Sequence, residues 1–149
     1  MLFLGIVRQH IGGYDKFMNP EKFLSTLYLG DRACKKILID GWNNRFCIQV
    51  NLISKIKENT DSWNYYSDED IENGWLIFTD ISCIKFVPEG VVPNDLINEI
   101  KVKKSNEDYI FSISIDSVSE SGERKEVNIQ VNAQKIYIES NEKFMSDLK

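Results

Sequence analysis

The sequence predicts a mainly β domain, or a β-dominated α+β domain, folded as an antiparallel sandwich or a partly closed barrel. Two observations predict it. Runs in which isoleucine, valine and phenylalanine alternate with polar residues recur through residues 33–138, and this period of two is typical of strands with one buried and one wet face. Turn-forming residues separate the runs at the spacing of a sandwich or barrel, which leaves room for about seven to eight strands and a short N-terminal helix.

The length and composition indicate one folded domain. The chain has 149 residues, of which 42% are hydrophobic and 28% charged, and a chain of this size buries about 70% of the surface that its unfolded form exposes. No internal repeat and no long linker divides the sequence. We therefore expect a single β-rich domain over residues 19–140, followed by a polar tail over residues 141–149.

Residues 1–18 differ from the rest, because they lack a clear period and end at a second methionine, Met18. The Gly12-Gly13 pair ahead of Met18 can be encoded by a bacterial ribosome-binding signal, which suggests that Met18 is the natural start. On this hypothesis residues 1–17 are upstream sequence translated in error, and we mark residues 1–18 as a non-native or poorly structured leader. The alternative is a short strand over residues 2–7. N-terminal sequencing of protein made from the native gene distinguishes the two.

The first predicted element of the domain is the short helix. Asn19 is a favourable N-cap residue, and Pro20 suits the first helical position. Phe23, Leu24 and Leu27 follow at the spacing of one helical face. The helix should therefore extend to about residue 28.

A β-hairpin follows, over residues 36–40 and 46–52. Its strands alternate in polarity, and the connection Gly41-Trp42-Asn43-Asn44 contains residues that tight turns favour. A tryptophan at such a tip either packs across a neighbouring loop or is exposed for binding. Together with Trp63 or Trp75, an exposed Trp42 would line a groove for a carbohydrate or a peptide.

The remaining strands are predicted from the same alternation. After a loop over residues 57–74, with a turn of helix at residues 68–72, we expect strands at residues 75–78, 81–87, 99–103, 109–115, 127–133 and 136–138. Pro88-Glu89-Gly90 and residues 119–123 supply turns between them. The alternation is most regular in residues 109–115 and 127–133, which is typical of a long antiparallel pair.

Three cysteines, Cys34, Cys47 and Cys83, are an odd number without the spacing of a disulfide framework or a zinc site. We interpret them as reduced thiols packed on strands, which indicates a reducing compartment. The apolar stretch at residues 1–7 is shorter than the roughly 20 residues of a membrane-spanning helix, and it lacks the parts of a secretion signal. The expected location is the cytoplasm, without membrane contact.

The single histidine, His10, lies in the suspected leader. Serine and cysteine nucleophiles most often borrow histidine as a base, and zinc sites rely on histidine and cysteine. No glycine-rich phosphate-binding motif is present either. We therefore expect no catalytic residue, no metal and no cofactor, and favour a non-enzymatic protein over chemistry by carboxylates alone.

The most unusual segment is both acidic and aromatic. Between residues 58 and 74 there are six acidic residues and no basic one, against a net charge of −5 for the whole chain. Three interpretations compete: a solvated loop, a calcium site and a protein-binding surface. An EF-hand loop starting at Asp68 requires glycine and glutamate where this chain has Asn73 and Thr79, so calcium binding is disfavoured.

A protein-binding surface is the functional interpretation of this segment. Tyrosine and tryptophan anchor protein interfaces, and clustered carboxylates attract a basic partner. The sequence therefore favours a cytosolic binding module, such as an immunity-type inhibitor of a basic protein. The expected contact residues are Trp42, Trp63, Tyr65, Tyr66, Asp68, Glu69, Asp70 and Glu72.

Two other classes of protein stay open. A small-ligand-binding or carboxylate-dependent enzyme domain would show a deep pocket that holds ionisable groups, and a structural oligomer subunit would show a broad apolar patch. Nucleic-acid binding is disfavoured, because the phosphate backbone requires a basic surface. We interpret the local run of Lys101, Lys103 and Lys104 as charges that protect an edge strand from aggregation.

Several of these motifs resemble a family of small bacterial proteins of unknown function. The resemblance is carried by residues 28–34, by Ile39-Asp40-Gly41-Trp42-Asn43, by Trp63-Asn64-Tyr65-Tyr66 with Glu69-Asp70-Ile71, and by Pro93-Asn94-Asp95. It covers about residues 23–139 and brings no established activity with it. Proteins of this kind are similar in size and composition to the small immunity proteins found beside bacterial polymorphic toxins, which implies an inhibitor.

Overall fold

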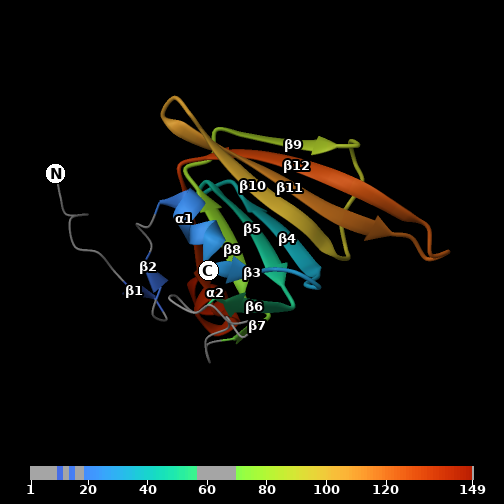
Figure 1. The fold of residues 1–149 in the computed structure, drawn as a ribbon, viewed down its shortest axis with the longest axis horizontal. Helices are drawn as coiled ribbons and strands as arrows, with labels where there is room; N and C mark the ends of the chain where they lie inside the picture. The colour runs from blue at the N-terminus through green and yellow to red at the C-terminus, as the bar shows by residue number, and fades with distance from the viewer. Residues whose placement is uncertain (1–9, 12–13, 16–18, 57–69, 149) are drawn as a thin grey trace.

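Two four-stranded antiparallel sheets make up most of the computed structural model, which describes residues 10–11, 14–15, 19–56 and 70–148 (Figure 1). The outer sheet contains, in spatial order, β10 (Ile97–Ser105), β11 (Asp108–Val118), β12 (Arg124–Ala133) and β9 (Cys83–Val87). The central sheet contains β13 (Lys135–Glu139), β8 (Trp75–Thr79), β5 (Arg45–Val50) and β4 (Cys34–Asp40). The predicted mainly β sandwich is confirmed.

Smaller elements surround the two sheets. A three-stranded sheet is formed by β3 (Leu27–Tyr28), β6 (Leu52–Lys55) and β7 (Ile71–Glu72), and a hairpin by β1 (His10–Ile11) and β2 (Tyr14–Asp15). The helices are α1 (Pro20–Ser25) and α2 (Asn141–Asp147). No helix in the described residues is long and apolar enough to cross a membrane.

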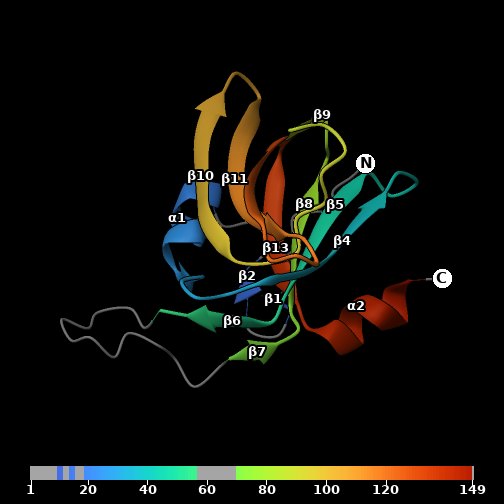
Figure 2. The same ribbon diagram turned by 90° about the vertical axis from the view of Figure 1, so that its right-hand side faces the viewer.

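The two sheets are joined along one side by strands that pass from one sheet to the other. After three connecting residues β8 continues into β9, and β12 continues into β13 after Gln134. On the opposite side the contact is a single bridge between Ala33 and Leu96. The outer sheet ends at β10 and β9 and the central sheet at β13 and β4, so the described strands form no closed barrel (Figure 2).

The core lies between the two sheets. The alternation predicted for residues 109–115 and 127–133 is present in β11 and β12, where Phe111 pairs with Val131 and Ile113 with Ile129. Opposite them, Phe78 of the central sheet contacts the ring of Phe111 at a centroid distance of 4.9 Å. All five side chains are essentially inaccessible to water, so the interior is filled by apolar atoms.

The central sheet is also buried on its other face, by α2. Cys47, Trp75, Ile77 and Tyr137 point away from the core and pack with Phe144 of the helix. The two-sided burial explains why β5 does not show the expected wet face. Within the expected polar tail over residues 141–149, residues 141–147 form α2, which is a third layer of the fold.

Helix α2 forms within the expected tail because its first turn is capped and because it buries apolar side chains. The side chain of Ser140 accepts a hydrogen bond from the backbone N–H of Lys143, which caps the first turn. Phe144 is fully buried, and Leu148, four residues later, packs against the same cluster. Two inward apolar residues are enough to hold a short helix against the sheet, but they are too few to make a clear helical period in the sequence.

Helix α1 begins as predicted and ends earlier. The side chain of Asn19 accepts hydrogen bonds from the N–H groups of Glu21 and Lys22, and Pro20 is the first helical residue. The helix stops at Ser25 because the next residues pair as β3 with β6. Tertiary strand pairing therefore overrides the helical pattern over the last predicted turn.

The predicted turn of helix at residues 68–72 is wrong for its last two residues. Ile71 and Glu72 form β7, which pairs with Ile53 and Leu52 of β6. Ile71 packs against the main core, which a strand at this position allows. The rest of the predicted loop, residues 57–69, lies outside the described residues.

A polar cluster ties the connection between β9 and β10 to the end of β11 and the start of β12. The backbone N–H groups of Asn94 and Asp95 donate to the carbonyl oxygen of Asp116. The buried carboxylate of Asp116 accepts hydrogen bonds from Asn98, at 2.7 Å, and from Arg124. These two donors, Asn98 foremost, hold the pKa of Asp116 below its ordinary value of 3.8.

We expect Asp116→Asn to reduce the loss of stability in acid. Because the pKa of Asp116 is lower in the folded chain than in the unfolded one, its carboxylate stabilises the fold above the ordinary value and loses this effect as the pH falls through the folded-state pKa. Urea unfolding of both proteins between about pH 6 and about pH 3 measures the effect. The variant should be less stable at the upper limit and approach the wild type at the lower one, and a constant difference would contradict the assignment.

Candidate functional site

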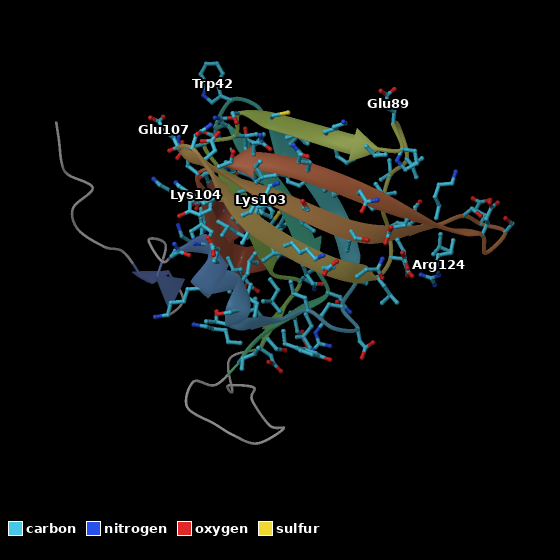
Figure 3. All side chains as sticks on the ribbon, turned by 45° about the horizontal axis from the view of Figure 1, so that its top comes forward. Trp42, Glu89, Lys103, Lys104, Glu107 and Arg124 are labelled. Carbon is cyan, nitrogen blue, oxygen red and sulfur yellow. The ribbon has the colours of Figure 1, made fainter. Side chains whose placement is uncertain are left out.

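The tip of the β4–β5 hairpin presents the most exposed large apolar side chain of the described residues. Trp42 is 96% exposed, and Figure 3 shows its indole projecting beyond the sheets. Of the two interpretations made from the sequence, exposure is confirmed and packing across a neighbouring loop is wrong.

The backbone that carries Trp42 is held by one carboxylate. Asp40 accepts hydrogen bonds from the N–H of Asn43 at 3.2 Å and from its side-chain amide at 2.9 Å. These bonds and an ion pair with Arg45 at 3.1 Å lower the pKa of Asp40. Asn44 takes the left-handed conformation, with φ 53°, which asparagine tolerates better than most residues. The tip is therefore ordered before any partner arrives.

Arg45 connects this tip to the layer beneath α2. Its guanidinium group lies 5.4 Å from the ring centroid of Phe144 and hydrogen-bonds to Tyr137. Nearby, burial raises the pKa of the Cys47 thiol to about 12. At neutral pH this thiol is protonated, which makes it a packing group and a poor nucleophile.

The acidic residues of the expected site are only partly described. Asp70 and Glu72 are exposed, and Glu72 belongs to β7. Trp63, Tyr65, Tyr66, Asp68 and Glu69 lie outside the described residues. Because β7 pairs with β6 beyond the far end of β5, the structure separates Asp70 and Glu72 from Trp42 by the length of that strand.

Trp75 does not line a groove with Trp42. Only 3% of Trp75 is exposed, its ring stacks on Phe144 at a centroid distance of 3.9 Å, and its N–H donates to Asn141. It faces Gln49, near the opposite end of β5 from the tip. The predicted groove between these two tryptophans is therefore wrong.

An apolar groove that the sequence did not reveal runs beside β9. Its volume is about 480 Å³, and we name it the β9 groove. Its apolar wall is formed by Ile84 and Phe86 of the strand and by Val91 and Val92 of the following loop. Val92 is 69% exposed. The only sequence signal was this pair of valines between two turn residues, Gly90 and Pro93.

The β9 groove lies on the same side of the molecule as the β4–β5 hairpin. Phe86 packs edge-on against Phe46 at 6.3 Å, and Phe46 pairs with the exposed Ile39 of β4. Thr79, which pairs with Arg45 at the hairpin tip, is separated from the start of β9 by three residues. Trp42 thus stands near the end of the sandwich at which β9 begins (Figure 3).

The three cysteines are free thiols on strands, as predicted, with Cys34 and Cys47 buried and Cys83 exposed. Burial raises the pKa of Cys34 to about 11. Within residues 19–56 and 70–148, no group of three histidine, cysteine or acidic side chains is placed to hold a metal ion.

A family model described as a family of unknown function (DUF6258) matches residues 18–148. The match begins at Met18 and includes Trp42, the acidic segment and α2. No curated protein and no solved structure matches the chain.

Proposed function

We propose that the chain, which belongs to the DUF6258 family of unknown function, is a non-enzymatic protein-binding module that contacts its partner through Trp42. The observation that carries the proposal is the exposed indole on an ordered hairpin tip. Tryptophan is among the residues that contribute most to protein interfaces. Because the tip is fixed by Asp40, little conformational entropy is lost when it binds.

The partner in this proposal is a basic protein, and the chain acts on it as an immunity-type inhibitor in the cytoplasm of a bacterium. A net charge of −5, with six acids gathered between residues 58 and 74, supports attraction of such a partner. Asp70 and Glu72 are exposed members of that group. Since they lie far from Trp42 along β5, we assign them to steering of the encounter and Trp42 to anchoring.

The replacement Trp42→Ala tests the anchor. We expect the affinity for the partner, once isolated on the wild-type chain and purified, to fall about thirtyfold, which corresponds to about 2 kcal/mol. Titration calorimetry measures it, with Met145→Ala as the control, because Met145 is also exposed but lies on α2. An unchanged dissociation constant in the Trp42 variant would refute the anchor.

Charge reversal tests the steering in the same assay. The double variant Asp70→Lys, Glu72→Lys should slow association at low salt and differ little from wild type at high salt. The matched control is Glu107→Lys, Glu120→Lys, which changes the net charge equally at two exposed turn positions. Equal slowing in both double variants would assign the effect to net charge and refute a steering role for the acidic segment.

A further inference from the structure

Strand β9 is an open edge of the outer sheet. It pairs with β12 through residues 83–87 and is the last strand on its side. Among the described residues, no other backbone or side-chain group hydrogen-bonds to the backbone of residues 83–87. Backbone N–H and C=O groups on the outer side of β9 therefore have no hydrogen-bond partner in the sheet. A further β-strand is the element that can pair with all of them.

The open edge of β9 carries fewer charges than the edge strands β10 and β4, and its protection is limited to its short length, to Lys85 and to the Pro88 that follows it. β10 exposes Glu99, Lys101, Lys103 and Lys104, as the sequence predicted for an edge strand. β4 begins with the exposed Lys35 and Lys36 at a register shift. Lysines and bulges are the usual devices that keep edge strands from pairing with other chains. β9 has one charged residue, Lys85.

The β9 groove can accept side chains of a strand that pairs with the open edge. Ile84 and Phe86 are half-buried on the inner side of β9, and Val91 and Val92 face them from the next loop. Side chains of an added strand alternate between its two faces. Every second residue of that strand would therefore enter the apolar part of the groove. Lys85 and Glu89 also line the groove, and the residues between would lie on the side of Lys85.

We propose that the open edge of β9 accepts an extended segment of the partner as an added β-strand. This inference rests on the proposed function and states how the partner is held. The segment has apolar residues at alternate positions, which fill the β9 groove, and an acidic residue between them that pairs with Lys85. Lys85 has no ion pair with another described residue, and its neighbour on β12 is the neutral Gln130.

Charge favours a different protein over a second copy of this chain. Two antiparallel β9 strands centred on Lys85 would place two lysines opposite each other, which destabilises a cross-strand pair. A segment with an acidic residue at that position is stabilised instead. Because β9 begins near Trp42, a strand added along it also brings the partner within reach of the proposed anchor.

The test uses the full chain and random peptides of about twelve residues, long enough to span β9. Selection for binding should enrich peptides with apolar residues at every second position and an acidic residue between them. A synthetic peptide of an enriched sequence should protect outward-facing amides of residues 83–87 from hydrogen exchange by about tenfold. Enrichment without a period of two, no enrichment, or protection confined to other strands would overturn the proposal.

Two further measurements distinguish strand pairing at the β9 edge from nonspecific binding of apolar peptides. Val87→Glu with Val92→Glu places charges at the edge and the groove, at positions 49% and 69% exposed, which repel the acidic residue of the segment and should weaken peptide binding about tenfold. The control Ser112→Glu with Ser121→Glu adds the same charge at exposed positions elsewhere and should change peptide binding less than about twofold. A peptide with alternate backbone amides methylated should bind weakly to the unmodified chain, and equal binding would exclude strand addition.

These outcomes are distinguishable from failure of the proposed anchor. If Trp42→Ala leaves partner affinity unchanged while the peptides still protect β9, the anchor is refuted and the strand acceptor stands. If the partner needs Trp42 but protects no β9 amide, the strand acceptor is refuted and the anchor stands. Sedimentation of the free chain as a dimer that protects the same amides would assign the edge to a second copy and overturn the proposal.

Discussion

Phe144→Ala should lower the free energy of unfolding by about 3–5 kcal/mol, the range found when a buried aromatic side chain is truncated. Phe144 is fully buried, stacks on Trp75 at 3.9 Å and lies under the guanidinium group of Arg45. Its removal leaves a cavity between α2 and the central sheet and exposes the outer face of that sheet to water. Urea unfolding followed by tryptophan fluorescence measures the change.

Met145→Ala is the matched control for this prediction. The two residues are adjacent on α2, but Met145 is 53% exposed, so its truncation should change stability by less than about 0.5 kcal/mol. If both variants lost equal stability, the effect would come from the helix backbone and not from the buried ring. If neither lost stability, α2 would not be part of the cooperative unit.

The sequence predicted those strands whose environment repeats with a period of two. β11 and β12 are long, antiparallel and wet on one face, so their inward residues, such as Ile113 and Ile129, alternate visibly with polar ones. β5 was predicted as a strand with a wet face, which it lacks because α2 covers Cys47 and Gln49. Alternation of apolar and polar residues indicates that one face of a strand is buried. It does not show whether an element from elsewhere in the chain covers the other face.

The candidate site was predicted only in part, for a related reason. The hairpin fixed the position of Trp42 at a tip, but whether a tip residue is covered depends on the loops that approach it from elsewhere in the fold. The β9 groove depends on the same kind of information. Val91 and Val92 are two ordinary apolar residues in sequence, and they become a surface because β9 is the last strand of its sheet.

Asn141→Ala should destabilise the fold by about 2–3 kcal/mol, because it removes an acceptor that two buried donors share, and an unsatisfied buried donor costs about 1–3 kcal/mol. The indole of Trp75 loses its acceptor, whereas Gln49 keeps a hydrogen bond to the carbonyl oxygen of Asn73. The side-chain oxygen of Asn141 accepts hydrogen bonds from Gln49 at 3.1 Å and from the indole N–H of Trp75 at 3.0 Å. Gln49 and Trp75 are both buried on the central sheet. A polar residue at the first position of α2 thus joins the helix to the sheet in addition to the buried ring of Phe144.

Two companion variants separate the lost hydrogen bonds from other effects of the change. Asn141→Asp keeps an acceptor oxygen for both donors and adds an acidic residue to the first turn of a helix, where negative charge is favourable, so it should lose less stability than Asn141→Ala. In the background of Gln49→Leu one donor is absent, and Asn141→Ala should then cost about 1–2 kcal/mol less than in the wild type. Equal losses in the two backgrounds would show that Gln49 and Asn141 are not coupled. Asn141 would then contribute to joining α2 to the sheet through the indole N–H of Trp75 and not through Gln49.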